Sequence, residues 1–532
     1  MAQLHTAPQK IIAAPTRNDG TVSGGVPRAG FRQWISLAVL TLPVVLVAAD
    51  STILGFAVPS LSRALEPSAS EMLWIIDVYS FVLAGLLVTM GTLGDKIGRK
   101  KLLLIGSAGF GVASVIAAFA PDATSLIAAR AALGIAGATL MPSTLSMLRD
   151  IFRDNNQRRI AIGIWSAAAS AGAALGPIAG GFLLEHFWWG SVFLVNVPVI
   201  VAIVIAGAFL LPESRNPHPA KFDILSSLYS LAGILPVVFA IKHMVESGFD
   251  LVTLGSAAVG GLFLAVFIRR QRVLRDPMID VELFKNPRFS TGIAVQTGSI
   301  FALAGSLFVI TQYLQLVLGM GPMEAAFWLI PAMVAEAGSA LLAAAVAKKI
   351  GVRPAITIGM TLVAVGFAIA VVAGAHMPVI VLGAGMFVLG FGTGLSYALS
   401  SDAIMGSVQP ERAGSAAAVA ETAYEMGHAL GVAILGSILA VVYRAAIDVP
   451  ATLGADLADK ARSTLGGAME IASDVPNPAA AKALTESAQG AFLNGFTVLG
   501  IIASALMLGI ALLAWKTLPK DLAVDAASAA EH

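Results

Sequence analysis

The segment from Glu421 to Leu430, ETAYEMGHAL, places two carboxylates and an imidazole in an otherwise apolar stretch of Ala, Gly, Val, Ile and Leu. Glu421 and Glu425 are four residues apart and His428 follows three residues later, so a helix would place all three on one face. Tyr424 lies beside them. Two carboxylates in a low dielectric repel each other when both are ionised, so we expect at least one to hold a proton when no cation is bound. The pattern predicts a site where a proton and a cationic ligand compete, or else a structural carboxylate pair tied to Arg or a backbone group.

Other ionisable residues also interrupt long apolar stretches. Asp50, Asp77 and Arg130 do so in the first third of the chain, and Glu336 does so in the second half. Insertion of Asp, Lys or Arg at the centre of a bilayer costs roughly 2.5 to 3.5 kcal/mol, so each such residue is a functional candidate by default. The alternative for Asp50 and Arg130 is that they only form a structural ion pair.

The composition is that of a membrane protein. Hydrophobic residues make up 57% of the 532 residues, charged residues only 12%, and the mean hydropathy is +0.84, whereas soluble domains carry about 25% charged residues. The absence of Cys excludes disulfides, thiolate metal sites and Cys nucleophiles. The sequence contains no GxxxxGK[ST] motif for a nucleotide and no basic patch with interleaved aromatics for a nucleic acid. We therefore expect no metal, no cofactor and no nucleic-acid partner.

The apolar segments have the length of membrane-spanning helices, which need roughly 20 residues each. Fourteen such segments are present, and the even number places both termini on one side of the membrane. Lys and Arg collect in the loops after the second, fourth, eighth and tenth segments, which predicts that these loops and both termini are cytoplasmic. The expected cores are 34–60, 72–94, 101–120, 124–147, 160–184, 189–211, 223–243, 250–269, 289–318, 323–347, 354–374, 378–405, 412–441 and 490–516.

A weak internal repeat predicts two related halves. GTLGDKIGRKK after the second segment resembles AAAVAKKIGVRP after the tenth, and each places basic residues around Ile-Gly. Repeats of this kind are typical of transporters. The predicted fold is all-α and polytopic, with 14 transmembrane helices in two pseudo-symmetric six-helix bundles plus two extra central helices. The expected division is a disordered cytoplasmic tail (1–33), an N-terminal bundle (34–211), a linker with the two extra helices (212–288), a C-terminal bundle (289–516) containing a long external loop (442–489), and a cytoplasmic tail (517–532).

The two extra helices, at 223–269, are expected to pack outside any central cavity, and the sequence assigns them no chemistry. The external loop at 442–489 is rich in Ala with mixed charge and is expected to form a short surface helix, and the sequence assigns it no role.

The loop GTLGDKIGRKKLL contains several glycines. They allow a tight turn between two helices, and Asp95 is placed to accept hydrogen bonds from Arg99 or from a helix N-terminus. Such contacts can form in one conformation and break in another. The alternative is a basic loop that only sets topology. The residues concerned are Gly91, Gly94, Asp95, Gly98 and Arg99.

A second glycine pattern, GAALGPIAGG, removes side chains along one stripe of a helix. Its GxxxG spacing predicts close packing against a neighbouring helix, and the proline loosens the helix so that it can bend. Packing without any part in gating is the alternative. The residues are Gly172, Gly176, Pro177, Gly180 and Gly181.

These motifs together resemble the major facilitator superfamily. The loop from Gly91 resembles that family's loop between helices 2 and 3, GAALGPIAGG resembles the helix 5 motif of its antiporters, and LIAARAALGIAGA resembles the helix 4 motif, although Leu133 replaces its usual polar residue. DSTILGFAVPSL, FLVNVP and TQYLQLVLG resemble the fourteen-helix drug:proton antiporters. WIIDVYS and ETAYEMG resemble exporters of quaternary ammonium compounds within that branch.

The resemblance implies a proton-driven multidrug antiporter of the cell membrane, an antibiotic-resistance type of function that needs only the proton motive force. The resemblance also implies that the protein exports lipophilic cations. It implies contact with membrane lipids and a functional monomer. The resemblance places Asp50 and Arg130 in proton coupling and makes Asp77 available to drug or proton from the outer cavity. It makes the loop from Gly91 a latch for the outward-open state. Tyr424 is the aromatic residue expected to contact the cation. His428 either relays protons or only forms a hydrogen bond.

Two other kinds of function stay open. The same fold could export an antibiotic, an amino acid or a lipid-like metabolite. A polytopic membrane enzyme normally shows clustered His and acidic residues at a membrane face, whereas the 7 His of this chain are scattered. A channel would show conductance in a planar bilayer, which an antiporter should not.

Overall fold

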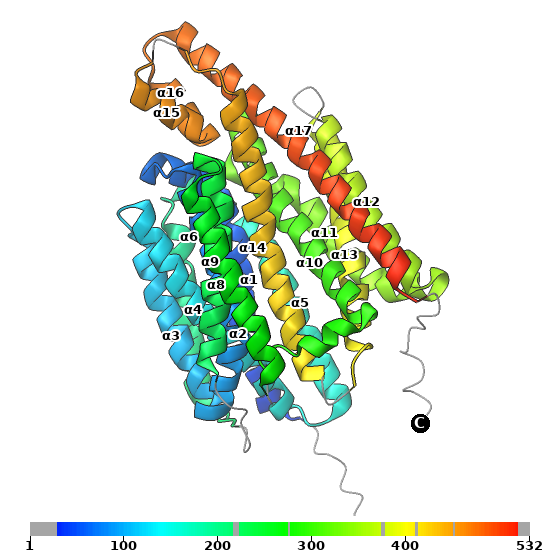
Figure 1. Ribbon diagram of the computed structural model, residues 1–532. Coiled ribbons are helices and arrows are strands. Elements are labelled where there is room, and N and C mark those ends of the chain that lie inside the picture. The colour runs from blue at the N-terminus through cyan, green and yellow to red at the C-terminus, as the bar shows by residue number, and fades with distance from the viewer. Residues whose placement is uncertain are drawn as a thin grey trace, which may run out of the picture.

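The computed structural model describes residues 29–215, 223–274, 277–373, 378–409, 413–450 and 453–519, and in these the regular secondary structure is helical throughout. Fourteen of the described helices are long and apolar enough to span a membrane, which confirms the predicted all-α fold class (Figure 1). Most of the predicted tails at 1–33 and 517–532 lie outside the described residues.

The N-terminal half is a bundle in which α1 packs on α5, α4 packs on both α2 and α3, and α3 packs on α7. The short helix α6 leads directly into α7, and together they form one span. The bounds are α1 Phe31–Leu65, α2 Ala69–Ile97, α3 Arg99–Ala118, α4 Ala123–Ile151, α5 Asn155–His186, α6 Ser191–Leu194 and α7 Asn196–Leu210.

The C-terminal half repeats this pairing with different helices. Here α10 packs on α14, α13 packs on both α11 and α12, and α12 packs on α17. The same order of contacts in the two halves is the structural form of the internal repeat. The bounds are η1 Val281–Lys285, α10 Pro287–Gln312, its π-helical continuation η2 Tyr313–Val317, α11 Pro322–Ile350, α12 Val352–Ala373, α13 Val379–Met405, α14 Ala413–Ala446 and α17 Pro478–Thr517.

The repeated Ile-Gly pair marks equivalent turns in the two halves. Gly98 joins α2 to α3 with a φ of 112°, and Gly351 joins α11 to α12 with a φ of 90°. Side chains with a Cβ rarely adopt positive φ, so only glycine makes these turns without strain. The turns between spans are therefore set by single residues that the sequence repeats.

Side-chain caps fix where several helices begin. Ser68 accepts a hydrogen bond from the backbone of Glu71, whose side chain accepts one from Ser68 in return, which is a capping box. The N-caps of α4, α5, α8 and α9 are aspartates whose carboxylates accept a hydrogen bond from the backbone three residues later: Asp122, Asp154, Asp223 and Asp250. These caps satisfy backbone donors that the first turn leaves free.

The two halves meet mainly through α2 against α14 and α5 against α11. We call the side where α1 begins and α17 ends the terminal side, and the opposite side the distal side. Gly181 at the distal end of α5 lies against Met323 at the distal start of α11, and Gly436 of α14 lies against Leu73 of α2. These contacts hold the halves together on the distal side.

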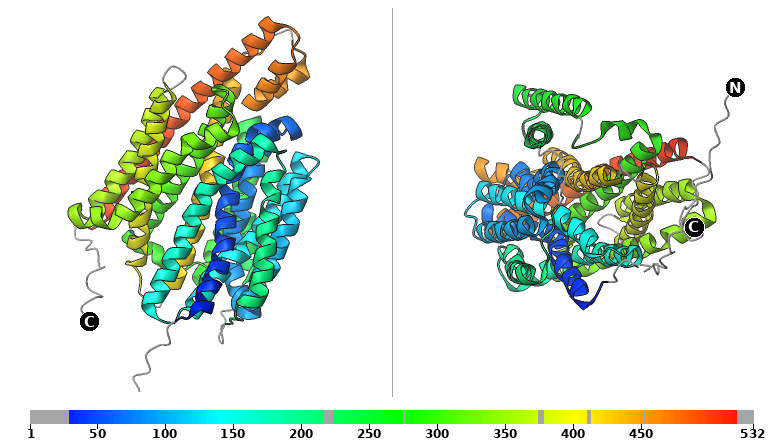
Figure 2. Two further views of the ribbon diagram at one scale, coloured as in Figure 1. Left: turned by 180° about the vertical axis from the view of Figure 1, so that it is seen from behind. Right: turned by 90° about the horizontal axis from the view of Figure 1, so that it is seen from below.

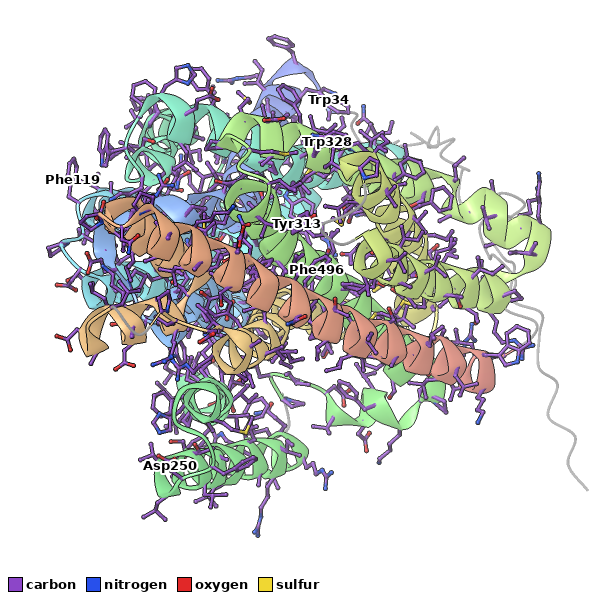
Figure 3. The ribbon with its side chains drawn as sticks, turned by 90° about the horizontal axis from the view of Figure 1, so that it is seen from above. Trp34, Phe119, Asp250, Tyr313, Trp328 and Phe496 are labelled. Atoms are coloured by element: carbon purple, nitrogen blue, oxygen red, sulfur yellow. The ribbon has the colours of Figure 1, made fainter. Side chains whose placement is uncertain are left out.

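Two extra helices, α8 (Ile224–Ser247) and α9 (Leu251–Val273), form a pair outside the two bundles. They pack on each other, and α8 also contacts α2 and α14. Figure 2 shows the pair standing off the rest of the protein when it is seen from below, and Figure 3 shows the same from above, with Asp250 at the turn between the two helices.

The predicted external loop forms an ordered cap on the distal side, made of α15 (Ala455–Ser463), α16 (Leu465–Asp474) and the start of α17. The Tyr443 hydroxyl donates to the carbonyl of Ala461 at 2.9 Å, and Lys460 pairs with Glu66 at the end of α1 at 2.8 Å. The loop is therefore more ordered than the sequence predicts, because it packs on both halves.

Candidate functional site

The carboxylates of the opening motif lie on α14 in the interior of the protein. Glu425 is only 4% exposed, and Glu421, Tyr424 and His428 are half-buried, as expected for side chains that face an internal space. Among the described residues, no Lys or Arg forms an ion pair with Glu421 or Glu425. The predicted alternative, a pair tied to an arginine, therefore has no counterpart in the described part of the chain.

Two tyrosines and a third carboxylate join this group, which we call the C-terminal acidic cluster: Glu336, Tyr397, Glu421, Tyr424 and Glu425. The rings of Tyr397 and Tyr424 meet edge to face, with centroids 5.9 Å apart. Both tyrosines lie close enough to all three carboxylates for the charge of each carboxylate to act on the tyrosine hydroxyls. The cluster combines uncompensated negative charge with aromatic edges and faces, which are the components of a site for an organic cation.

Asp50 on α1 has an entirely different setting. One carboxylate oxygen lies 2.6 Å from Arg130 Nη1, and the other accepts a hydrogen bond from Asn196 Nδ2 at 3.1 Å. Arg130 also donates to the carbonyl of Ile75 at 3.1 Å and lies over the ring of Tyr79, 4.5 Å from its centroid. Asp50 and Arg130 are each 1% exposed. The structure thus brings Asp50 and Arg130 together as a buried, well-supported ion pair.

Asp77 on α2 is also paired, and its partner comes from the extra helices. Lys242 Nζ of α8 lies 3.0 Å from Asp77 Oδ2, and both side chains are fully buried. The ammonium also lies over the ring of Trp74, 4.2 Å from its centroid. The sequence assigns the extra helices no chemistry, whereas in the structure α8 supplies the cation of this pair.

A line of polar side chains connects the two halves where α2 meets α14. Tyr79 lies within electrostatic reach of Asp50 and Glu425. Ser80, the next residue, lies with its hydroxyl 3.5 Å from His428 Nδ1. His428 is therefore placed between the Asp50–Arg130 pair and the C-terminal acidic cluster.

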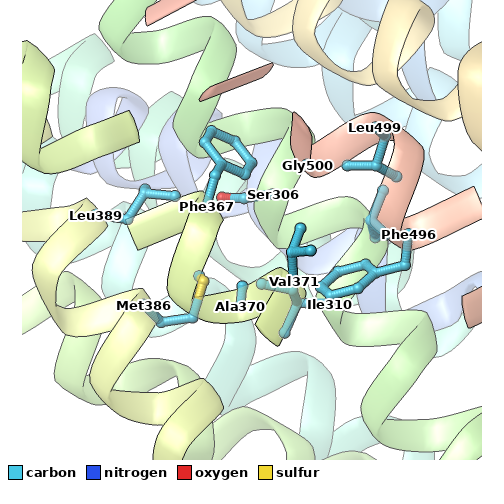
Figure 4. A pocket seen from close by; sticks show the side chains of 11 residues that line it. Ser306, Ile310, Phe367, Ala370, Val371, Met386, Leu389, Phe496, Leu499 and Gly500 are labelled. Atoms are coloured by element: carbon cyan, nitrogen blue, oxygen red, sulfur yellow. The ribbon is translucent and has the colours of Figure 1, made fainter. Parts of the chain in front are cut away.

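A pocket lies between the halves beside this line. It encloses about 430 Å³, counting its open mouth, and is lined by α1, α2, α5, α10 and α14. Ser51, the neighbour of Asp50, lines it together with Pro177 and His428. A second pocket lies within the C-terminal half, between α10, α12, α13 and α17 (Figure 4). Its lining is apolar apart from Ser306, so it has no charge with which to hold an ion.

The glycine-rich loop after α2 forms a network inside the N-terminal half. Asp95 accepts from Arg99 at 2.7 Å, and Arg99 also contacts Asp150 at the end of α4 and the Ser214 hydroxyl at 3.1 Å. The Ser214 hydroxyl in turn donates to Asp150. Of the two partners considered for Asp95, the structure shows Arg99. A Cβ at Gly91 would lie in ordinary contact with Pro142 of α4, and a Cβ at Gly94 would lie only 3.2 Å from the side chain of Leu102 of α3.

The glycine stripe of α5 packs on α1. Gly172, Gly176 and Gly180 face the backbone or side chains of Val45, Ala49, Thr52 and Ile53, so that a Cβ at any of them would clash. Gly181 points the other way, toward α11, where a Cβ would lie 2.9 Å from the Cα of Met323. The stripe therefore serves packing within a half, and its last glycine serves contact between the halves.

Two polar residues near the predicted site were not singled out from the sequence. Asn196 lies in the motif FLVNVP and is the second partner of Asp50, and an amide in so apolar a run was a usable signal. Lys242 lies near the end of its apolar segment in the sequence, and its pairing with Asp77 depends on how α8 packs. Within the described residues, no three side chains of His, Asp or Glu converge closely enough to hold a metal ion.

Similar proteins are known at both the sequence and the structural level. A family model described as Major Facilitator Superfamily matches residues 40–432. The chain is 45% identical over 493 residues to the multidrug efflux pump LfrA of Mycolicibacterium smegmatis, covering 93% of this chain and 97% of LfrA. It is 36% identical over 492 residues to the methyl viologen resistance protein SmvA of Salmonella typhimurium, covering 92% of this chain and 99% of SmvA.

Among solved structures, a bacterial homolog of the human lysosomal transporter Spinster, in an inward-facing conformation, matches with a TM-score of 0.63. The match covers 92% of this chain and 99% of that chain. The sequences are 16% identical, so this likeness concerns the fold alone.

Proposed function

Because the chain belongs to the Major Facilitator Superfamily and is a multi-pass membrane transporter rather than an enzyme, we propose that it is a proton-coupled antiporter that exports lipophilic organic cations. The resemblance found in the sequence motifs is confirmed for the family and for drug efflux, since LfrA is a multidrug efflux pump. The proton coupling and the cationic cargo are the proposal.

One observation carries the proposal: the C-terminal acidic cluster has no basic partner among the described residues, whereas Asp50 and Asp77 do. Charge at membrane depth is costly unless it is compensated. A carboxylate without a protein cation is compensated either by a proton or by a cationic ligand. The cluster therefore has the property that coupled exchange requires, a site that is occupied by one or the other.

Exchange follows from this competition at Glu421 and Glu425. An organic cation entering the cluster stabilises the ionised carboxylates, so that a bound proton leaves. A proton that arrives from the opposite side neutralises the carboxylate, so that the cation loses its partner and leaves. A proton that moves down a membrane potential of about 100 mV releases about 2.3 kcal/mol, which is available to drive the cargo outward.

The aromatic part of the cluster favours lipophilic cations over metal ions or ammonium. Tyr397 and Tyr424 pack against each other edge to face, with ring centroids 5.9 Å apart, beside the carboxylates of the cluster. Aromatic faces attract desolvated organic cations by up to about 2 kcal/mol. SmvA confers resistance to methyl viologen, a bis-quaternary dication, and this supports the same class of cargo.

Alternating access would move the two halves, at 34–211 and 289–516, about this site. The contacts of Gly181 with Met323 and of Gly436 with Leu73 close the distal side in this conformation. If the basic loops are cytoplasmic, as their Lys and Arg content indicates, the distal side is the external side. As the resemblance implies, a monomer is the proposed working unit.

The test uses the full chain reconstituted into proteoliposomes with an imposed proton gradient, and ethidium as the probe. We expect ethidium accumulation in the wild type and loss of it in Glu421→Gln. Glu324→Gln is the matched control, because Glu324 is an exposed carboxylate in the first turn of α11. Ethidium accumulation that does not depend on the proton gradient, or that is unchanged in Glu421→Gln, contradicts the proposal. Export of a neutral or anionic compound without ethidium transport points to the alternative cargo.

A further inference from the structure

Helix α8 runs along α2 in the opposite direction, with contacts at successive levels. Thr89 of α2 touches Ser227 of α8 through their hydroxyls, and Gly85 has no Cβ where Leu231 packs. Nearer the distal side, Lys242 reaches Asp77. The ion pair is thus the last of several contacts, and the other contacts hold α8 in place without it.

Trp74 and Asp77 are three residues apart and therefore share one face of α2. A carboxylate beside an indole face is a suitable environment for an organic cation, because charge and the ring quadrupole both attract it. Lys242 occupies this environment, with its ammonium 3.0 Å from the carboxylate and 4.2 Å from the ring centroid. Arg130 is the other cation whose charge reaches Asp77, and its own ion-pair partner is Asp50.

The fit of Lys242 to this site is incomplete. An ammonium can donate three hydrogen bonds, yet neither its nitrogen nor either oxygen of Asp77 has a well-aligned hydrogen bond among the described residues. The contrast is Arg130, which donates to two backbone carbonyls as well as to Asp50. A buried ion pair is favourable only when its geometry is good and further hydrogen bonds support it. Lys242 is therefore held by the charge of Asp77 and by the ring of Trp74, without the further hydrogen bonds that support Arg130.

The site also adjoins the pocket between the halves and the polar side chains where α2 meets α14. Ile76, the neighbour of Asp77, lines the pocket between the halves. Ser80, one turn along from Asp77, contacts His428 of α14. Around Lys242, side chains of α2, α8 and α14 form one apolar cluster at the seam, with Phe81, Val238 and Ala429 among its members. Trp74 itself is only half-buried.

We propose that Trp74 and Asp77 form a second binding site for lipophilic monocations and that Lys242 is its tethered occupant, which the cargo must displace. The cargo class rests on the proposed function, whereas the site rests on the contacts of Lys242. Displacement needs only the flexible four-carbon stem of the lysine to swing away, because Gly85 and Thr89 keep their contacts with α8. The extra helix pair thereby acts as a competitor of the cargo that is part of the chain.

The test compares cation binding by the purified full chain and by Lys242→Met, with tetraphenylphosphonium as the probe. Measurement at pH 8 limits competition by protons for the freed carboxylate. We expect Lys242→Met to lower the Kd about tenfold, since the carboxylate and the indole become vacant. Lys285→Met, which removes an exposed lysine, should leave the Kd unchanged.

The double variant Lys242→Met with Asp77→Asn should lose the gain. An unchanged or weaker affinity in Lys242→Met, or a gain that survives Asp77→Asn, overturns the proposal. If the wild type neither binds nor transports the probe but Lys242→Met binds it through Asp77, the site stands and the proposed cargo is wrong. If the wild type transports the probe and Lys242→Met gains nothing, the proposed function stands and the site does not.

A second measurement applies if Lys242→Met does not fold. In the wild type, saturating tetraphenylphosphonium should increase acetylation of Lys242 relative to Lys285, because the displaced amine becomes accessible. Equal acetylation of Lys242 with and without bound probe would falsify displacement.

Discussion

In the N-terminal half, Asp50 contacts Arg130 and Asn196, and Asp77 contacts Lys242. In the C-terminal half, Glu421 and Glu425 have tyrosines and a histidine near them and no Lys or Arg in an ion pair within the described chain. The two sets of carboxylates lie in the same membrane-spanning architecture but differ in whether the protein supplies the balancing charge. Asp50 is balanced and hydrogen-bonded within the protein, whereas a carboxylate without a protein cation has to take its balancing proton or ligand from the surroundings.

The largest effect is expected when the buried ion pair of Asp50 and Arg130 is broken. Arg130→Met leaves Asp50 buried without its cation, and removal of one partner from a buried ion pair costs about 3 to 5 kcal/mol. We expect the purified variant to unfold at a much lower temperature than the wild type. Asp50→Asn combined with Arg130→Met should recover part of the loss. A single variant as stable as the wild type would show that the pair has no structural role.

The second largest effect is expected at the C-terminal acidic cluster, where a substitution should reduce transport without reducing stability. Glu425→Gln keeps the shape of the side chain and removes only its exchangeable proton and charge, so we expect transport to fall by more than about tenfold with the unfolding temperature unchanged or raised. The measurements are ethidium transport and thermal unfolding of the same preparation. A loss of stability like that of Arg130→Met would favour the structural interpretation of the carboxylate pair.

A smaller effect is expected from the aromatic part of the cluster. Tyr424→Ala removes a ring face worth up to about 2 kcal/mol to a desolvated cation, so the KM for ethidium should rise by as much as about thirtyfold. Tyr424→Phe keeps the ring and should change the KM little. Tyr229→Ala is the control, because Tyr229 stacks on Phe263 within the extra helix pair. Equal effects of Ala and Phe at position 424 would assign the role to the hydroxyl.

The smallest effect is expected from a carboxylate at the surface. Its substitution gives a reference against which the effects at the buried carboxylates of both halves can be compared. The pKa of Asp250 is lowered from 3.8 to about 2, chiefly by the backbone N–H of Thr253 and then by His243. A lowered pKa in the folded state stabilises the fold above pH 3.8 and loses that contribution as pH falls toward 2. Asp250→Ala should therefore lower the unfolding temperature slightly at pH 7, and Asp250→Asn, which still caps α9 but lacks the charge, should lower it less.

The sequence predicts elements whose signal is local. Each membrane span can be recognised as an apolar run in the sequence. The Ile-Gly turns at Gly98 and Gly351 can be recognised as a repeat, because each turn needs a residue without a Cβ. The shared face of Glu421, Glu425 and His428 follows from helical spacing alone. Such features need no knowledge of which helices become neighbours.

Partnerships between distant helices could not be predicted in the same way. The sequence places Lys242 near the end of an apolar segment, where a lysine usually reaches the membrane surface. Only the packing of α8 along α2 turns it inward to Asp77. The order of the distal cap likewise depends on Tyr443 and Glu66, which lie outside the cap and far apart in the sequence.

That cap also offers a rigid handle for imaging. A transporter of this kind has little ordered mass outside the membrane, which makes its particles hard to align in electron cryomicroscopy. Here α15 and α16 are fixed to the spans by Tyr443, by Lys460 and by the close approach of Gly466 to Ser62. An antibody fragment raised against the exposed surface of α15 would be held rigidly enough to serve as a fiducial marker. Its binding to intact cells would also report directly which face of the protein is outside.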